Sequence, residues 1–241
     1  MTEPDTPMNP SNQAKRRLTS RDVLRFQMVD DPQVSPDGVQ VAWVRTWLDA
    51  EENRYRARIH VTDLATGATR QLTNGAGQDT HPAWSPDGRF LAYLATPGPQ
   101  SEKNQPGVPE HAVSIVDRGP QLMVVGGGGG VARPLTNLRG GARAPAWSPD
   151  GTRIAFNTFV DPAVGLETSG GITEATDDPY VRYNRDVLVV NRVRWQADSV
   201  GFLGNYRSQV AWVRFDPENL DALPEPVLAT NGEFDLSAPV W

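Results

Sequence analysis

A five-residue string that occurs three times constrains the fold more than any other feature of the sequence. It reads Trp-Ser-Pro-Asp-Gly at residues 84–88 and 147–151, and Val-Ser-Pro-Asp-Gly at residues 34–38. Proline presets φ for a turn, serine and aspartate bond to nearby backbone, and glycine tolerates positive φ. We therefore expect each copy to be a tight turn between two strands. The turn residues are Ser35, Asp37, Gly38, Ser85, Asp87, Gly88, Ser148, Asp150 and Gly151.

The same strand pattern follows each turn, three residues after the glycine. It consists of an aliphatic residue, an alanine and an aromatic residue, at 41–43, 91–93 and 154–156. The two large side chains share one face of a strand, and the alanine faces the other way. Residues 60–74 also match residues 123–137 at the spacing that separates the two tryptophan-containing turns. About four strands per repeat indicate the blades of a β-propeller.

The sequence thus predicts an all-β fold with the architecture of an incomplete β-propeller. We expect about three four-stranded blades plus the first strand of a fourth, preceded by a short N-terminal helix. The blade starts fall near residues 34, 84, 147 and 241, and a polar insertion occupies about 161–185.

The chain divides into an N-terminal arm and one domain. Residues 1–17 are rich in proline and poor in apolar side chains, which predicts a disordered arm, and residues 18–241 form the partial propeller domain. Thr19 or Ser20 is the expected N-cap of the short helix, and Pro32 sets its limit.

Composition and charge narrow the functional classes. The net charge of −6 argues against a nucleic-acid binder, which needs a basic face. The chain has no cysteine, its three histidines are far apart, and the five glycines at 126–130 precede a strand-like stretch instead of a helix. We therefore predict no metal and no cofactor. No apolar run has signal-peptide or membrane-spanning character, which predicts a cytoplasmic protein without a membrane partner.

The order of these motifs resembles the repeats of TolB and of the N-terminal propellers of the prolyl oligopeptidase family of serine peptidases. Two further stretches are similar to the acylaminoacyl-peptidase-like branch, namely the opening at 18–38 and the segment at 191–203. The resemblance covers about residues 18–241. It implies a propeller that precedes an α/β-hydrolase domain and admits short peptides while excluding folded proteins.

The leading functional hypothesis is therefore a noncatalytic, substrate-gating propeller portion of such a peptidase. The sequence contains no Gly-x-Ser-x-Gly nucleophile elbow, so we assign no catalytic residue, and hydrolysis would come from a C-terminal α/β-hydrolase domain that is absent from this chain. Whether the chain is part of an enzyme stays open. The alternative is a TolB-like protein-binding propeller, and a third interpretation is a degenerate fragment with no independent role.

Two pairs of charged residues are candidates for contact with a peptide substrate. Glu51 and Glu52 match the kind of glutamate pair with which dipeptidyl peptidases, according to the resemblance, bind a free amine. Their mixed-charge surroundings at 49–54 favour a solvated loop instead. Arg192 and Arg194 alternate along a predicted strand, where they would attract a substrate carboxylate. Pairing with acidic side chains of the insertion is the competing interpretation.

The end of the sequence at Trp241 leads to a further prediction about the propeller. The sequence stops after Trp241, where the next Ser-Pro-Asp-Gly turn is expected, so we expect a truncated propeller. Closed propellers have about four to eight blades. An open stack exposes a strand edge, and we expect self-association through that edge.

Overall fold

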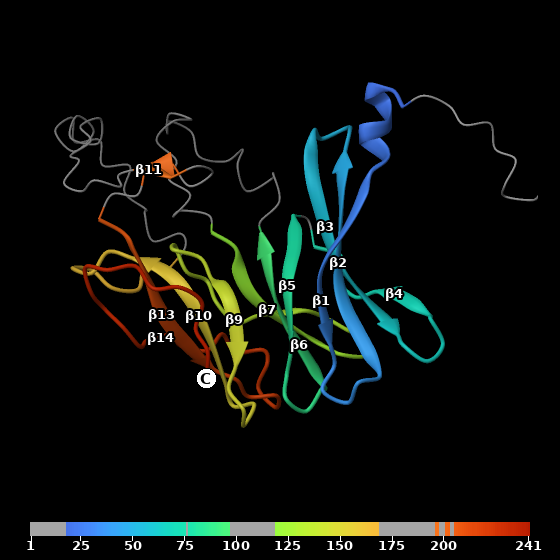
Figure 1. Ribbon diagram of the computed structural model, residues 1–241. Helices are drawn as coiled ribbons and strands as arrows, with labels where there is room; N and C mark the ends of the chain where they lie inside the picture. The colour runs from blue at the N-terminus through green and yellow to red at the C-terminus, as the bar shows by residue number, and fades with distance from the viewer. Residues whose placement is uncertain (1–17, 76, 97–118, 169–195, 198–200, 203–204) are drawn as a thin grey trace, which may run out of the picture.

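The computed structural model describes residues 18–75, 77–96, 119–168, 196–197, 201–202 and 205–241. These residues form a nearly all-β structure with one short helix near the N-terminus, as the sequence predicts (Figure 1). The elements are η2 (Ser20–Arg25), β1 (Gln27–Val34), β2 (Gln40–Asp49), β3 (Arg54–Asp63), β4 (Thr69–Gln71), β5 (Gln78–Trp84), β6 (Phe90–Thr96), β7 (Gln121–Gly126), β8 (Arg133–Pro134), β9 (Arg143–Trp147), β10 (Arg153–Val160), β11 (Gln196–Ala197), β12 (Gly201–Phe202), β13 (Arg207–Arg214) and β14 (Val227–Leu228).

The strands group into four-stranded antiparallel meanders, which we call the first, second and third units. The first unit consists of β1 to β4, the second of β5 to β8, and the third of β9, β10, β13 and β14. A parallel pairing of Ala57 with Gln78 joins the first two units into one sheet, whereas the third is a separate sheet. Successive meanders of this kind give the described residues a propeller-like architecture.

The charged stretch after β2 is the tip of an extended hairpin. Strands β2 and β3 pair without interruption from Gln40 opposite Asp63 to Asp49 opposite Arg54. Asn53 closes the tip with a φ of 50°, in the left-handed region that asparagine tolerates better than most residues. The tip of the hairpin thereby lies beyond the end of β5, which pairs with β3 (Figure 1).

The N-terminal helix is a 3-10 helix and starts as the sequence predicts. Thr19 is its N-cap, and the backbone N–H of Thr19 donates to the Asp22 carboxylate over 2.7 Å. Such a bond satisfies backbone polarity at a helix start. The apolar residues Val23, Leu24, Phe26 and Met28 predict one apolar side for this helix, but the helix ends at Arg25, and Met28 lies in β1.

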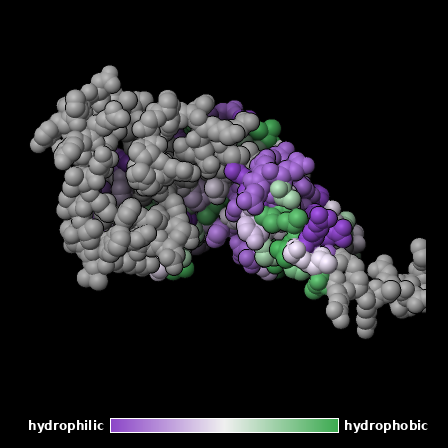
Figure 2. All heavy atoms as spheres, turned by 90° about the horizontal axis from the view of Figure 1, so that it is seen from above, coloured by the Kyte–Doolittle hydropathy of each residue, from purple (hydrophilic) through white to green (hydrophobic). Residues whose placement is uncertain are grey.

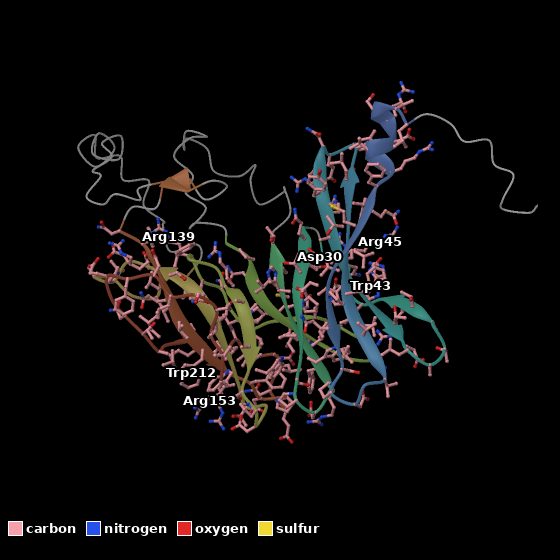
Figure 3. All side chains as sticks on the ribbon, in the orientation of Figure 1. Asp30, Trp43, Arg45, Arg139, Arg153 and Trp212 are labelled. Carbon is pink, nitrogen blue, oxygen red and sulfur yellow. The ribbon has the colours of Figure 1, made fainter. Side chains whose placement is uncertain are left out.

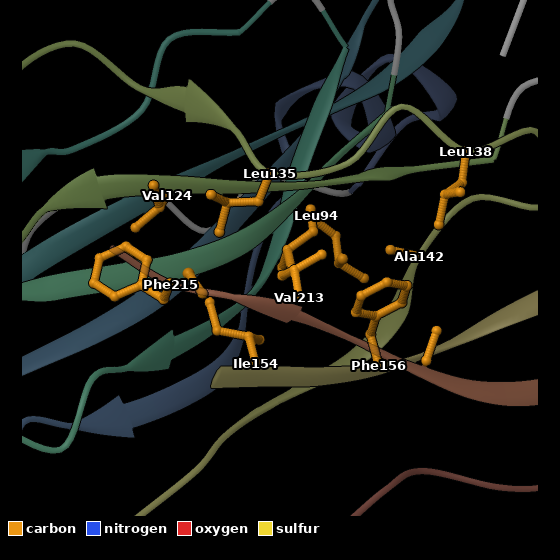
Figure 4. Packing of buried hydrophobic residues seen from close by; sticks show 12 residues of the cluster. Leu94, Val124, Leu135, Leu138, Ala142, Ile154, Phe156, Val213 and Phe215 are labelled. Carbon is orange, nitrogen blue, oxygen red and sulfur yellow. The ribbon is translucent and has the colours of Figure 1, made fainter. Parts of the chain in front are cut away.

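Two apolar clusters lie between successive units. One cluster joins the first and second units and includes Val44, Ile59 and Leu91. The other joins the second and third units and surrounds the fully buried Phe156 (Figure 4). Burial of one such side chain contributes about 1.5–3 kcal/mol to stability. The units therefore form their cores by facing one another.

A threonine after the fourth strand of each unit repeats one hydrogen bond. Its hydroxyl oxygen accepts from a backbone N–H of the third strand at 2.9–3.1 Å. The donor and acceptor pairs are Ile59 with Thr73, Leu122 with Thr136, and Val210 with Thr230. This bond identifies β13 and β14 as the third and fourth strands of the third unit, although the chain between β10 and β13 is much longer than in the other units.

The tryptophan at the end of a first strand links its unit to the preceding one. Trp84 Nε1 donates to the carbonyl oxygen of Gln33 at 3.0 Å. Trp147 Nε1 donates in the same way to Ala83 at 2.9 Å. Trp241 Nε1 donates to Ala146, also at 2.9 Å. In each pair the acceptor is the residue immediately before the first position of the preceding turn string.

We expect the Trp147→Phe variant to test this link. Phenylalanine keeps a ring beside Phe215, which the indole meets edge-on with ring centroids 4.8 Å apart, but it removes the N–H and leaves the Ala83 carbonyl without its donor. The free energy of unfolding in urea should fall by about 1–3 kcal/mol. Trp212→Phe is the control, because that indole packs beside the Arg153 guanidinium on the third unit. Equal losses in the two variants would show that only ring volume matters.

Candidate functional site

The three Ser-Pro-Asp-Gly turns share one hydrogen-bond pattern. Each serine Oγ donates to the aspartate Oδ1 at 2.6 Å, and each glycine N–H donates to the serine carbonyl oxygen at 2.9 Å. The glycine φ is +70° or +71°, which side-chain-bearing residues rarely adopt. The three serines, Ser35, Ser85 and Ser148, are buried. Their hydroxyl groups are thus committed to holding the turn.

The hydrogen bonds in these turns lower the pKa of the turn aspartates. Burial opposes the ionisation of Asp87, but hydrogen bonds from Ser85 and Arg89 outweigh it and lower its pKa to about 2. Hydrogen bonds from Ser148 and Thr152 likewise lower the pKa of Asp150 to about 2. An acceptor bonded by several donors favours its charged form. The carboxylates are therefore ionised at neutral pH and act as structural acceptors.

The side of the first unit that points away from the second unit, which we call the free face, differs in its side chains from the corresponding side of the second unit. The second unit packs Tyr93 and Ala95 toward the first unit. At the matching positions of the first unit lie Trp43 and Arg45 on β2 (Figure 3). The Arg45 guanidinium lies 5.8 Å from the centroid of the Trp47 ring. The first unit thus has an indole and a guanidinium group at positions where the second unit has a phenol ring and a methyl group.

The side chains on the free face contact one another by ring stacking and a hydrogen bond. Trp43 stacks on His60 with ring centroids 4.8 Å apart, and its Nε1 donates to Thr62 Oγ1 at 2.9 Å. Burial is the main cause that lowers the pKa of His60, and the nearby Arg45 adds to the shift. The imidazole is therefore neutral at pH 7.

Apolar side chains are exposed beside this face, at the helix end of the molecule. Figure 2 shows green apolar spheres among hydrophilic ones where η2 and the start of β1 lie. The exposed side chains include Val23, Leu24, Phe26 and Met28. These side chains from η2, its C-terminal end and the start of β1 are thus not covered by the described residues.

A cavity of about 520 Å³ is lined mainly by the second unit. Its walls include Ala95 and Met123 from that unit, Gly75 from the end of the first unit, and Leu223 from the third. Asp79 on β5 lines the same cavity and is only 1% exposed. A carboxylate buried to this extent at a cavity wall is the most chemically specific feature among the described residues.

Two neighbours of Asp79 respond to its charge. Burial lowers the pKa of Arg58, and the Asp79 carboxylate partly offsets this effect. Burial together with the same carboxylate raises the pKa of Tyr93. Arg58 Nη1 donates to the carbonyl oxygens of Ala57 and Gly77 at 2.6 and 2.7 Å. The guanidinium thereby fastens the end of the first unit to the start of the second.

Of the two charged pairs that the sequence singles out, the structure describes only one. Glu51 and Glu52 are exposed at the tip of the β2–β3 hairpin. Glu52 pairs with Arg54 at 3.3 Å and with Arg56 at 2.7 Å. These contacts are those of a solvated hairpin tip, and a role in amine binding stays a prediction. Arg192 and Arg194 lie outside the described residues, as does most of the predicted insertion at 161–185.

Sequence reasoning missed the cavity and the role of Asp79. The cavity combines residues from all three units, and this combination depends on how the sheets pack. One signal was available: Asp79 lies five positions before Trp84, where the next repeat has the small apolar Ala142. An aspartate at a position that is apolar in the sister repeat marks a departure from simple packing.

The described residues hold no group of three or more histidine, aspartate or glutamate side chains arranged for a metal ion. None of the helices in that part of the chain has the length and apolar character needed to cross a membrane. The described residues thus form a propeller-like stack of meander units with a cavity whose walls carry both apolar and polar side chains.

Comparison with known proteins finds similarity to peptidases. No family model matches the chain. The uncharacterized peptidase YuxL of Bacillus subtilis is 33% identical over 140 residues, which cover 58% of this chain and 19% of YuxL. Dipeptidyl-peptidase 5 of Porphyromonas endodontalis is 37% identical over 69 residues, which cover 27% of this chain and 10% of that protein. The chain thus matches less than a fifth of either relative.

A solved structure shows the same fold. The acylaminoacyl peptidase of Pyrococcus horikoshii superposes with a TM-score of 0.53 at 18% identity, over 86% of this chain and 26% of its own. This likeness concerns the fold, since the identity is low. The sequence matches confirm the resemblance to peptidases that the repeat motifs indicate, and the superposition confirms the propeller-like fold.

Acid should weaken the turns in a defined pH window. The pKa of Asp150 is lower in the folded chain, at about 2, than in an unfolded chain, at about 4. Its contribution to stability is thus fully present above pH 4 and is lost as the pH falls toward 2. We expect the urea midpoint to fall over this window, and to fall less in Asp150→Asn. An identical pH dependence in both proteins would contradict the role given to this carboxylate.

Proposed function

We propose that this chain forms a noncatalytic propeller portion of a serine peptidase of the acylaminoacyl type. The observation that carries the proposal is the 33% identity to a peptidase over 140 residues, in a chain whose described residues are stacked meander units. The sequence contains no nucleophile elbow. Hydrolysis is then the task of an α/β-hydrolase domain that this chain does not contain.

The proposed role is control of access. Each meander unit is one blade, and residues 235–241 act as the first strand of a fourth blade, because Leu236 N–H donates to the Ser208 carbonyl and Trp241 links to Ala146. Closed propellers have about four to eight blades, so further blades complete the ring. A narrow channel through such a ring admits short peptides in the cytoplasm and excludes folded proteins.

Charged residues at the channel would select among peptides in this proposal. Glu51 and Glu52 at the hairpin tip would attract a free amino group, in competition with the arginines that already pair with Glu52. Arg192 and Arg194 would attract a substrate carboxylate. Both assignments rest on the sequence pattern.

The coding DNA downstream of this chain tests the proposal directly. We expect it to encode further Ser-Pro-Asp-Gly repeats and then a Gly-x-Ser-x-Gly elbow. The 241-residue chain alone should not hydrolyse acetyl-alanyl p-nitroanilide, whereas the polypeptide extended through the elbow should. A downstream region with repeats but without the elbow, or hydrolysis by the chain alone, would contradict the proposal. The first of these outcomes would favour a protein-binding propeller.

A further inference from the structure

The buried carboxylate of Asp79 is incompletely satisfied by the protein. Its Oδ2 accepts one hydrogen bond, from the backbone N–H of Gly75 at 3.2 Å. Within the described ranges it forms no ion pair within 4.0 Å. A buried carboxylate normally accepts several hydrogen bonds, because loss of hydration without replacement is costly. Asp79 therefore has acceptor capacity to spare at the cavity wall.

Arg58 does not use that capacity. Its Nη1 is directed to the carbonyl oxygens of Ala57 and Gly77, and the Asp79 carboxylate acts on the pKa of Arg58 as a charge at a distance. The two opposite charges nevertheless compensate in part, since the carboxylate offsets some of the effect of burial on the Arg58 guanidinium.

The floor of the cavity is shaped around the carboxylate. A side chain at Gly75 would place its Cβ 2.8 Å from Oδ1 and 3.2 Å from Oδ2 of Asp79. Such contacts are shorter than carbon and oxygen tolerate. Glycine at this position thus leaves room for the carboxylate.

The remaining walls combine apolar side chains with the polar Thr96, Gln121, Thr136 and Asn137. Ala95, Met123, Pro134 and Leu223 surround the cavity, and its volume of about 520 Å³ lies in the range of about 300–1,000 Å³ that is typical of small-molecule sites. One acidic group beside these apolar side chains matches a ligand with one cationic donor and a short hydrocarbon body, and the neighbouring hydroxyl and amide oxygens are further acceptors for such a donor. We propose that this cavity binds a small primary alkylammonium ion, with its ammonium group on Asp79.

The comparison between repeats supports a specific role for this site. In the repeat that follows, Ala142 takes the place of Asp79 and is fully buried. It belongs to the apolar cluster between the second and third units. The same position is thus compatible with a filled, apolar junction, so the fold does not require a carboxylate there.

The test titrates the ¹⁵N-labelled 241-residue chain with 3-methylbutylammonium chloride as the probe. Binding is measured from the changes in the backbone amide chemical shifts at pH 7. We expect saturable shifts at Asp79, Met123 and Leu223. Asp79→Asn, which keeps the shape of the side chain, should weaken binding by roughly tenfold or more, since a charged hydrogen bond is lost. Asp221→Asn is the charge-matched control, because that carboxylate pairs with Arg133 on the exposed surface. It should bind as the unmodified chain does.

The neutral analogue 3-methylbutanol separates charge recognition from apolar filling. It should bind roughly tenfold more weakly than the ammonium ion, or not at all. Equal affinity for the two probes, or unchanged affinity in Asp79→Asn, would overturn the proposal. Absence of saturable shifts would overturn it as well, and would leave Asp79 as a counter-ion of Arg58.

A second pair of variants covers the case in which Asp79→Asn does not fold. Leu223 is half exposed, so Leu223→Ala should fold and weaken binding several-fold by removing one apolar wall. Met123→Trp should block the cavity. Affinity unchanged in both variants would place the probe elsewhere and overturn the proposal. No hydrolysis is measured in these experiments, so their outcome is independent of the peptidase proposal.

Discussion

The bond from a tryptophan indole to a backbone carbonyl of the preceding unit is the interaction on which the described structure depends. It recurs three times, at 2.9–3.0 Å. Each apolar cluster forms only when two units face one another, and this bond fixes their relative position at the turn end of the sheets. It also explains why the tryptophan adjoins the Ser-Pro-Asp-Gly turn: the turn holds the end of the first strand, and the indole connects that end to its neighbour.

Local patterns in the sequence were sufficient to predict the fold class, the turns and the short helix. The turn residues act over a few positions, as in the bond from Ser85 Oγ to Asp87, and such contacts can be anticipated from residue types alone. The tryptophan bonds could not be anticipated in this way, since Trp147 meets Ala83 only after two units have packed. The tip of the β2–β3 hairpin is an intermediate case, because its charges fit a loop and a hairpin equally well.

The candidate site was harder to predict than the fold for the same reason. Asp79, Gly75 and Leu223 come from different units, and only the packed structure brings them to one cavity. The charged residues singled out in the sequence were instead chosen for their local pattern. Glu51 and Glu52 lie at an exposed tip, where neighbouring arginines satisfy Glu52. A motif that departs from its sister repeat is thus a better guide to a site than a run of charges.

Hydrogen exchange of the indole N–H groups, followed by NMR, tests the central claim most directly. If the units are joined as described, the indole protons of Trp84, Trp147 and Trp241 exchange more slowly than that of Trp212, which packs beside an arginine on the third unit. Exchange of all four at the same fast rate would contradict the account, because the units would then not be held by these bonds.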